Sequence, residues 1–553
     1  MTSPFHQVRS WLSVERTLLW IAVIYSIAIG LLSLVVPVAV QSLVNTVAFG
    51  NLLQPLVVLT LVVLAGLGFS GILQGLRTFV VELLQRRIFV RISSDVVGKL
   101  LRAKIDAFDG HHGPELVNRF LEVVTVQKSG AMLLIDGLSI FMQTSIGMIL
   151  LAVYHPWLLA FDVLLFLAIL VVLFPMGRGA IATSILESKA KYELVAWLEE
   201  IARWPASFKP ANGFAFATHR TDDLIKKYLG YRIKHFRILI RQVLGSLGLH
   251  ALASAVLLGA GGWLVIQRQL TLGQLVAAEL IVTVVVSGFS KFGKQLETFY
   301  DLCAAADKLS YLTELPMEET GREKLPEKRE GSQILFRDVR FAYQDGSPVL
   351  LNGSCQIRPG SRAALTGHGK TTFLDLIYAL RTPAGGEIEI DSLDIRDIQL
   401  ESLRAQIGLV RRAEIFHGTI ADNLRVASPA AGAVEMRAAL EQAGLLDEIR
   451  NLPDGLDTVL VTGGLPLSHS QALRLMIARE VLKRPRLLLL DECLDEIEDA
   501  KLRNRIMAGL FDSKNPWTLL VATKNPEIRA TCDQHFHLED GILREYTKRR
   551  PPR

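Results

Sequence analysis

The residues best suited to chemistry in this chain lie in the run 362–372, R-A-A-L-T-G-H-G-K-T-T. Its first half is apolar, as in a buried strand, and its last three residues open an apolar helix. The N–H groups of a glycine turn and of a helix N-terminus bind phosphate, while lysine reaches its outer oxygens and a threonine hydroxyl holds Mg²⁺. The run therefore predicts a polyphosphate site whose candidate ligands are Gly367, Gly369, Lys370, Thr371 and Thr372.

The match to a standard phosphate-binding loop is incomplete. The pattern G-x4-G-K-[ST] requires glycine six residues before Lys370, and Ala364 stands there. If the strand and the helix both keep their register, the loop between Gly367 and Gly369 is about three residues short. The sequence alone does not decide whether this loop still forms a cradle for phosphate.

A second candidate stretch is Leu487–Glu492, an apolar strand that ends in two carboxylates. It follows the lysine by about 120 residues, where phosphoryl-transfer sites carry a Mg²⁺ ligand and a catalytic base. We assign these roles to Asp491 and Glu492, respectively. Either motif alone is weak, but their order, with an Ile-Ala-Arg helix just before the acids, favours a nucleotide-binding domain.

The composition indicates that a membrane domain precedes this one. Half of the residues are hydrophobic, and the excess lies in the first 300 positions. The net charge of +5 requires no nucleic-acid partner, and the four cysteines lack the spacing of a metal site. Six apolar runs are long enough to span a bilayer: 17–41, 52–73, 132–153, 158–176, 243–267 and 270–290.

The connections between these runs differ in charge. Residues 77–128 and 178–241 are rich in Arg and Lys, which places them and both termini in the cytoplasm. We expect the spanning helices to extend beyond the bilayer, with turns near 108–114 and 205–213 that touch the cytosolic domain.

Residues 4–15 are predicted to form an interfacial helix without a signal-peptide cleavage site. Ionisable side chains inside the runs are candidates for contact with cargo: Asp136, Asp162, His250 and, foremost, Glu279.

Together these features resemble one half of an ABC transporter. The fold class implied is an α-helical membrane domain with six transmembrane helices, of the type I exporter fold, fused to an α/β P-loop NTPase domain. Loops 113–119 and 270–275 resemble those of type 1 secretion transporters, without their N-terminal peptidase domain. The expected division is an interfacial helix at 1–16, a transmembrane domain at 17–312, an exposed linker at 313–333, a nucleotide-binding domain at 334–545 and a basic tail at 546–553.

The resemblance implies ATP and Mg²⁺ as cofactors, with Thr371 and Asp491 as metal ligands. It also implies that Tyr343 stacks on adenine, although a half-buried strand aromatic explains the pattern equally well without the family. The family signature L-S-G-G-Q corresponds to L-S-H-S-Q here, so Ser468 and Gln471 are expected to face a nucleotide held by a second subunit. Lys524 stands where the family has its switch histidine.

Several of these positions depart from the family. Both signature glycines are lost, to His469 and Ser470, and only glycine allows so close a backbone approach. The glutamine that helps to hold Mg²⁺ is expected at Arg411 or Arg412, depending on a one-residue gap. Lys524 has no acceptor with which to orient an attacking water. We therefore predict weak or absent ATP hydrolysis by this chain alone.

The resulting hypothesis is an ATP-binding half transporter that exports an unknown substrate as a homodimer or heterodimer. We expect it in the bacterial inner membrane, in contact with lipid, with its nucleotide-binding domain in the cytoplasm. Two alternatives remain at this stage: a catalytically degenerate companion of an intact half transporter, and a non-hydrolysing membrane regulator.

Overall fold

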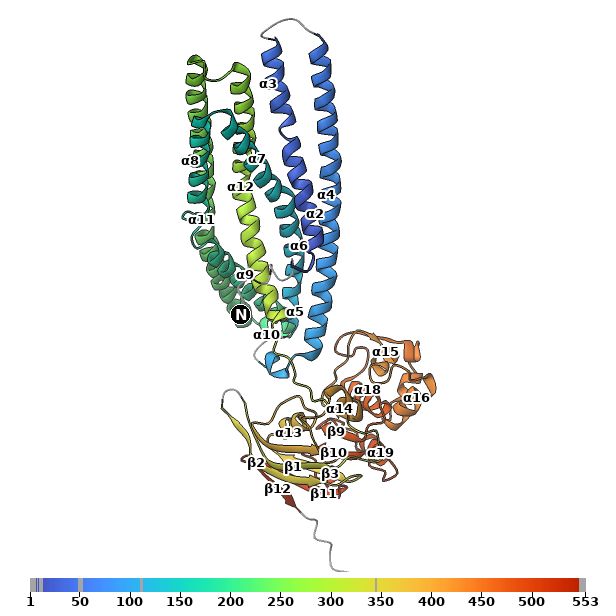
Figure 1. Cartoon of the computed structure of the whole chain (residues 1–553). Coiled ribbons are helices and arrows are strands. Elements are labelled where there is room, and N and C mark those ends of the chain that lie inside the picture. The colour runs from blue at the N-terminus through green and yellow to red at the C-terminus, as the bar shows by residue number, and fades with distance from the viewer. Residues whose placement is uncertain are drawn as a thin grey trace, which may run out of the picture. The chain divides into compact units, whose positions relative to one another are not determined.

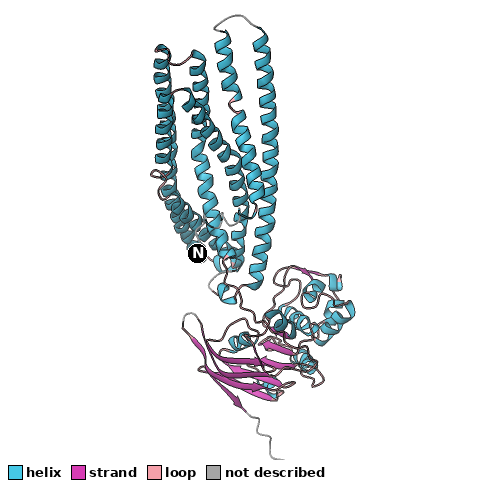
Figure 2. Ribbon diagram, in the orientation of Figure 1, coloured by secondary structure: helices cyan, strands magenta, loops and turns pink. Residues whose placement is uncertain are grey.

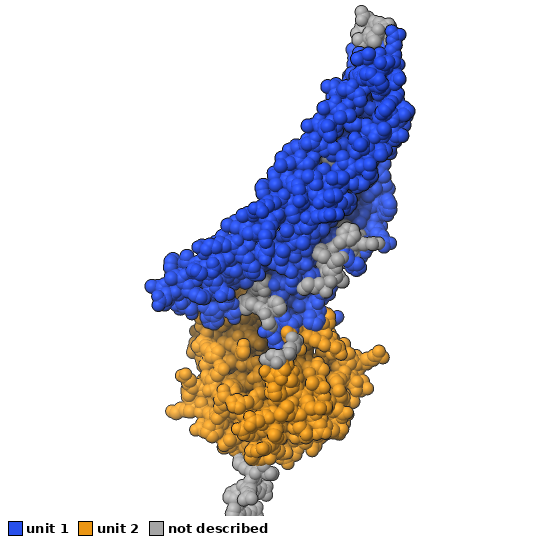
Figure 3. All heavy atoms as spheres, turned by 90° about the vertical axis from the view of Figure 1, so that its left-hand side faces the viewer, with its two compact units in different colours: residues 1–103, 107–316 blue, residues 104–106, 317–553 orange. Residues whose placement is uncertain are grey.

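The computed structural model describes residues 6, 8, 13–47, 53–109, 113–343 and 346–546, without the side chains of 47, 53, 113–115, 286, 287, 289, 290, 292 and 293. The chain divides into two compact units (Figure 3). The first comprises Met1–Ala103 and Ala107–Pro316, and the second comprises Lys104–Asp106 and Met317–Arg553. Most of the predicted interfacial helix at 4–15 and the middle of the predicted turn near 108–114 lie outside the described residues.

The regular elements described in the first unit are all helical (Figure 2). Figure 1 shows α2 and α3 end to end beside the longer α4, which contacts both. The longer helices are α2 (Arg16–Leu32), α3 (Val35–Val47), α4 (Leu53–Arg102), α6 (Glu122–Met132), α7 (Leu138–Tyr154), α8 (Pro156–Leu173), α9 (Ala180–Arg203), α11 (Ala211–Ile266) and α12 (Leu272–Thr313). Short helical turns connect them: η1 (Ile105–Phe108), α5 (Gly113–Asn118), η2 (Arg119–Leu121), η3 (Leu133–Gly137) and α10 (Pro205–Phe208).

Five of the described helical stretches are long and apolar enough to cross a membrane: Arg16–Thr46, Gln54–Arg102, Leu116–Tyr154, Pro156–Leu173 and Ala211–Ile266. A sixth, shorter apolar stretch, Leu272–Val285, opens α12. Among the described residues, most of each apolar run is helical. α11 has 56 residues and extends about 84 Å, well beyond the roughly 30 Å of a bilayer core. α11 is therefore much longer than a membrane span requires, and the extension of the spanning helices beyond the bilayer stays a prediction.

The helices of the membrane domain pack through apolar faces. One cluster joins α7, α8, α11 and α12 and includes Leu165, Leu257 and Ile281. Close approach depends on small residues: a Cβ added at Gly261 would lie 2.7 Å from Leu275. The second unit, in contrast, is built around a β-sheet.

The sheet has ten strands in the order β5-β4-β1-β2-β12-β11-β3-β10-β9-β6. Parallel pairs join β11, β3, β10, β9 and β6, and antiparallel pairs join β1 to β2 and to β4. The strands are β1 (Ile334–Ala342), β2 (Pro348–Ile357), β3 (Arg362–Gly367), β4 (Gly385–Ile390), β5 (Leu393–Asp394), β6 (Ile407–Val410), β9 (Leu487–Asp491), β10 (Thr518–Ala522), β11 (Gln534–Glu539) and β12 (Ile542–Tyr546), with β7 (Gly418–Thr419) and β8 (Val459–Leu460) as a separate pair.

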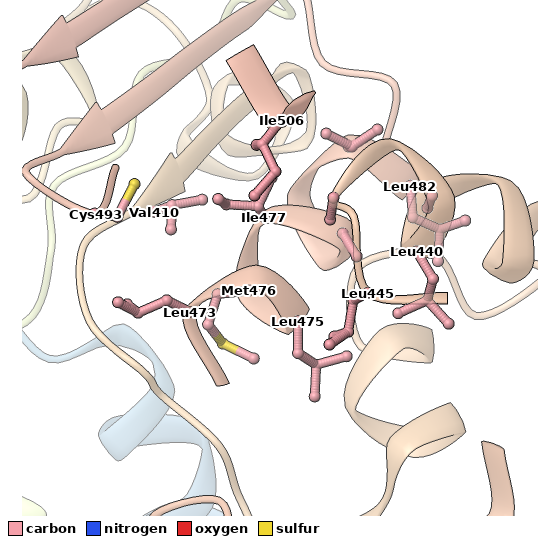
Figure 4. Packing of buried hydrophobic residues seen from close by; sticks show 14 of the residues in the cluster. Val410, Leu440, Leu445, Leu473, Leu475, Met476, Ile477, Leu482, Cys493 and Ile506 are labelled. Atoms are coloured by element: carbon pink, nitrogen blue, oxygen red, sulfur yellow. The ribbon is translucent and has the colours of Figure 1, made fainter. Parts of the chain in front are cut away.

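Two apolar cores support this unit. One lies between the antiparallel strands and the first helix, where the rings of Phe336 and Phe373 stack at 4.4 Å. The other surrounds the helix that carries Leu473 and Ile477 (Figure 4). The helices are α13 (Lys370–Ile377), α14 (Leu400–Gln406), α15 (Ile420–Arg425), α16 (Ala433–Gln442), α17 (Leu446–Arg450), η4 (Gly455–Asp457), α18 (His469–Leu482), α19 (Ala500–Leu510) and α20 (Pro526–Ala530).

The segment expected as an exposed linker is anchored to the second unit at defined points. Leu325 is buried in the first of the two cores, and Glu318 forms an ion pair with Arg404 at 2.7 Å. Most of the other residues between 313 and 333 are exposed.

Candidate functional site

The predicted phosphate loop connects β3 to α13 and is closely fitted to β11. Gly367 and Gly369 have φ angles of 97° and 78°, in the region that favours glycine. A Cβ added at Gly367 would lie 1.9 Å from the carbonyl oxygen of Leu538. The N–H of His368 donates to that same oxygen at 2.8 Å. The shortened loop therefore rests on the end of β11, and one of its N–H groups is used there.

The N-terminus of α13 remains suited to an anion. Phe373 is the first residue whose N–H donates back along the chain, to the carbonyl of Gly369 at 3.0 Å. The N–H groups of Lys370, Thr371 and Thr372 precede it at a helix end, where a phosphate is favoured. Both glycines and all three of these residues thus lie where the sequence predicted them, at one helix terminus.

The lysine of the loop is paired with the predicted catalytic base. Lys370 Nζ lies 3.1 Å from Glu492 Oε1, and Lys524 Nζ lies 2.9 Å from Glu492 Oε2. Partial burial acts to raise the pKa of Glu492, but the hydrogen bonds from Lys524 and Lys370 outweigh it, and the pKa is lowered. Its carboxylate is thereby held in the charged form between two cations, which weakens it as a base.

The end of the neighbouring strand fixes Lys524. Thr523 Oγ1 donates to Asp495 Oδ1 at 2.5 Å, and the backbone N–H of Lys524 donates to Asp495 Oδ2 at 2.7 Å. The hydrogen bond to Glu492 raises the pKa of Lys524, so the ammonium stays charged. Asp495 therefore holds the backbone at the switch position, while the Lys524 side chain is exposed and pairs with Glu492.

Of the two candidate arginines, Arg411 is the one directed at the metal position. It follows β6, and the register of Val410 with Leu490 puts it next to Asp491. Arg411 Nε lies 3.4 Å from Asp491 Oδ2, and Nη2 pairs with Asp375 Oδ1. Burial raises the pKa of Asp491, although a hydrogen bond from Thr371 and the charge of Arg411 act in the other direction.

The ring of Tyr343, which is predicted to stack on adenine, is covered on one face by Arg381. The Arg381 guanidinium lies 4.8 Å from the centroid of the Tyr343 ring, and Tyr343 Oη is 2.8 Å from Thr372 Oγ1. Arg381 Nε is also 3.4 Å from Asp375 Oδ2, and its Nη1 pairs with Asp106. Adenine stacking by Tyr343 therefore stays a prediction, restricted to the ring face that Arg381 leaves open.

Mg²⁺ does not fit this arrangement. Its strongest expected ligand, Asp491, already faces a guanidinium, and a second cation at the same carboxylate would be repelled. The residues of this chain consequently support no metal-dependent step here.

The signature residues Ser468 and Gln471 cap helix α18 and do not contact Lys370, Glu492 or Lys524 within this chain. Ser468 Oγ accepts the N–H of Gln471 at 3.3 Å, and Gln471 Oε1 accepts the N–H of Ser468 at 2.7 Å, so the two cap α18. Gln471 also donates to Glu448, and His469 pairs with Glu496 at 2.6 Å. A role toward a second subunit remains a prediction.

An open cavity of about 580 Å³ lies beside the ion pair of Glu492 and Lys524. These two residues line it together with Asp495, Glu496 and Glu527. The base position is thus reachable from solvent even though its charge is neutralised.

Sequence reasoning missed Asp375 and Arg381. Asp375 follows Thr371 by four residues on a helix, a spacing that places both on one face, so a signal was present. Arg381 belongs to no sequence motif. It reaches Asp375 because of the turn that follows α13.

Comparison with known proteins agrees with this architecture. The family model for the ABC transporter matches residues 350–495, and the model for the ABC transporter transmembrane region matches residues 19–201. The alpha-hemolysin translocation ATP-binding protein HlyB of Escherichia coli O157:H7 is 27% identical over 538 residues, covering 94% of this chain and 74% of that protein.

Two further proteins are similar. The mycobactin import ATP-binding/permease protein IrtB of Mycolicibacterium thermoresistibile is 30% identical over 317 residues, 56% of this chain and 54% of that protein. The solved structure of a bacterial Atm1-family ABC exporter with ATP bound has the same fold, with a TM-score of 0.83 at 22% identity, over 97% of this chain and 96% of that one. The chain therefore belongs to the ABC transporters, as an integral membrane half transporter with a transmembrane region and a nucleotide-binding domain.

Proposed function

We propose that this chain is the catalytically weak half of a heterodimeric ABC exporter. The observation that carries the proposal is the Glu492 carboxylate, held at 3.1 Å by Lys370 and at 2.9 Å by Lys524. Phosphoryl transfer depends on positioning and charge stabilisation, so a neutralised base and a displaced metal impair it together. A homodimer would carry these defects in both of its sites.

In a heterodimer the two composite sites differ. One combines the phosphate loop of this chain with the signature of its partner, and it binds ATP without hydrolysing it. The other combines the partner's loop, carboxylates and Mg²⁺ with Ser468 at the N-terminus of α18, whose dipole favours phosphate. Turnover in the pair would come from this second site.

The direction of transport is proposed from the relatives. The similarity to a translocation protein extends over 94% of this chain, whereas that to an import protein extends over 56%. We therefore favour export, through a membrane-spanning bundle in contact with lipid. The basic segments 77–128 and 178–241 support a cytoplasmic nucleotide-binding domain and cytoplasmic termini, in the inner membrane of a bacterium.

A regulator that binds no nucleotide is the second candidate. It is favoured by the contact of Lys370 with Glu492 and by its hydrogen bond to the carbonyl of Gly367, which occupy the lysine that a phosphate would need. Equilibrium binding of ATP to the purified chain, with Lys370→Ala as control, separates the two candidates. Binding that the substitution abolishes supports the transporter half, and absence of binding by the folded protein supports the regulator.

The heterodimer itself is tested by asymmetric substitution. The chain is co-purified with an intact half transporter and reconstituted, and ATP turnover is measured for Ser468→Ala and for Glu492→Gln, both made only in this chain. Ser468→Ala should lower turnover, and Glu492→Gln should leave it unchanged. If Glu492→Gln abolishes turnover, the proposed division of labour is wrong.

A further inference from the structure

In the nucleotide site, the guanidinium of Arg411 lies beside Asp491, the residue expected to bind the metal ion. Arg411 lies beside Asp491 because β6 and β9 are parallel neighbours, with Val410 opposite Leu490. The side chain of Asp491 is 4% exposed and that of Arg411 is 21% exposed, so the contact of 3.4 Å lies in a partly desolvated place. Water screens such a contact less than one at the surface.

A second carboxylate holds the guanidinium from the other side. The Asp375 side chain is 6% exposed and pairs with Arg411 Nη2 through Oδ1 and with Arg381 Nε through Oδ2. Two buried carboxylates and two arginines therefore alternate in one network. The Arg411 guanidinium thus lies between the carboxylates of Asp491 and Asp375.

Arginine is suited to replace a divalent ion toward phosphate. Its planar fork has five N–H donors, and phosphate oxygens accept them in pairs. Of the three guanidinium nitrogens, Nε faces Asp491 and Nη2 pairs with Asp375. Thr371, in the first turn of α13, contributes a side-chain hydrogen bond to Asp491.

We infer that this site takes a nucleoside triphosphate free of metal, with the Arg411 guanidinium in the place of Mg²⁺. The inference rests on the proposed binding of ATP by the loop that contains Lys370. It adds that the binding is independent of divalent metal, and that this independence comes from Arg411.

The test measures ATP affinity of the full chain in lipid nanodiscs, by equilibrium dialysis with EDTA or with Mg²⁺. The wild type should bind ATP with dissociation constants that agree within about twofold under the two conditions. In Arg411→Gln, affinity in EDTA should fall by at least about tenfold, as for the loss of a charge-assisted hydrogen bond, and Mg²⁺ should restore it.

The neighbouring arginine provides a matched control. Arg412 is exposed, and Arg412→Gln makes the same charge change one residue away, so it should behave as the wild type. Arg411→Lys keeps a positive charge and should retain binding in EDTA better than Arg411→Gln does. Thermal unfolding of each variant establishes that it is folded. Mn²⁺ electron paramagnetic resonance gives a readout of metal capture, which should occur only in Arg411→Gln.

The outcomes distinguish a failure of the metal-free inference from a failure of the proposed ATP site. Binding by the wild type that requires Mg²⁺ overturns the inference and leaves the proposed function standing. Absence of binding under both conditions overturns the proposed ATP site, and the inference with it. An Arg412→Gln variant that matches Arg411→Gln also overturns the inference, because general charge would then account for the effect.

Discussion

Lys370 Nζ lies 3.1 Å from Glu492 Oε1, so the residue that should meet phosphate and the residue that should activate water neutralise each other. The side chain of Lys370 is only 9% exposed, and Lys524 closes the other oxygen of the same carboxylate. A phosphate that binds Lys370 must compete with a preformed ion pair. This competition is the physical reason to expect modest ATP affinity and little hydrolysis.

The ion pairs of Glu492 should stabilise the nucleotide-binding domain in a pH-dependent way. Because the folded pKa of Glu492 is lowered, its stabilisation is present above the ordinary value of 4.5 and is lost as the pH falls through the folded pKa. Glu492→Gln should cost about 1 kcal/mol at pH 7, discounted for partial exposure. Thermal unfolding of both proteins from pH 7 to pH 3 should show the difference shrink, whereas a constant difference would mean that charge is not its cause.

Gly367 should tolerate no side chain. Its φ is 97°, and a Cβ would lie 1.9 Å from the carbonyl oxygen of Leu538, so Gly367→Ala should cost more than about 2 kcal/mol and abolish ATP binding. Gly360 has a φ of 70° with nothing within 4 Å of an added Cβ. Gly360→Ala should therefore cost only about 1–2 kcal/mol of backbone strain. Similar thermal midpoints for the two variants would contradict the close fit of the loop to β11.

Tyr343 should contribute to ATP affinity through its ring. Stacking of a base on an aromatic side chain contributes about 1–3 kcal/mol, so Tyr343→Ala should weaken ATP binding by about tenfold or more. Tyr343→Phe loses the hydrogen bond to Thr372 but keeps the ring, and it should bind within about twofold of the wild type. Equal affinities of all three proteins in equilibrium dialysis would leave Tyr343 as a packing residue of the strand.

Asp162 offers a test within the membrane domain. It is 3% exposed in α8, between Leu158 and Leu165, and neither carboxyl oxygen has a hydrogen-bond partner. A buried polar group without a partner costs about 1–3 kcal/mol, so Asp162→Leu should raise the thermal midpoint in detergent. Asp162→Asn, which keeps polar atoms, should raise it less. A lower midpoint for Asp162→Leu would contradict this, because the carboxyl group would then stabilise the fold.

The sequence predicted the fold class because its signals are local. Apolar runs of bilayer length correspond to helices, and the alternation of strand, turn and helix around Lys370 corresponds to β3 and α13. Asp491 and Glu492 were predicted from their place at the end of an apolar strand. Their proximity to Lys370 follows from the sheet order, in which β10 joins β3 to β9.

The ion pairs within the site could not be predicted from the sequence. Arg411 and Asp375 are 36 residues apart in the chain, and they meet only because β6 lies at the edge next to β9. A one-residue gap left Arg411 and Arg412 equivalent in the sequence, and the strand register distinguishes them. Likewise, the sequence placed Lys524 at the switch position, but its contact with Glu492 depends on the turn that Asp495 holds.

The most direct measurement is ATP turnover by the purified full chain, alone in lipid nanodiscs, with Mg²⁺ present and with Glu492→Gln as the matched control. The ion pairs of Glu492 and the position of Arg411 predict that the wild type and the variant release phosphate at the same background rate. Turnover above that background that is lost in Glu492→Gln would contradict the account, because Glu492 would then act as a base despite Lys370 and Lys524.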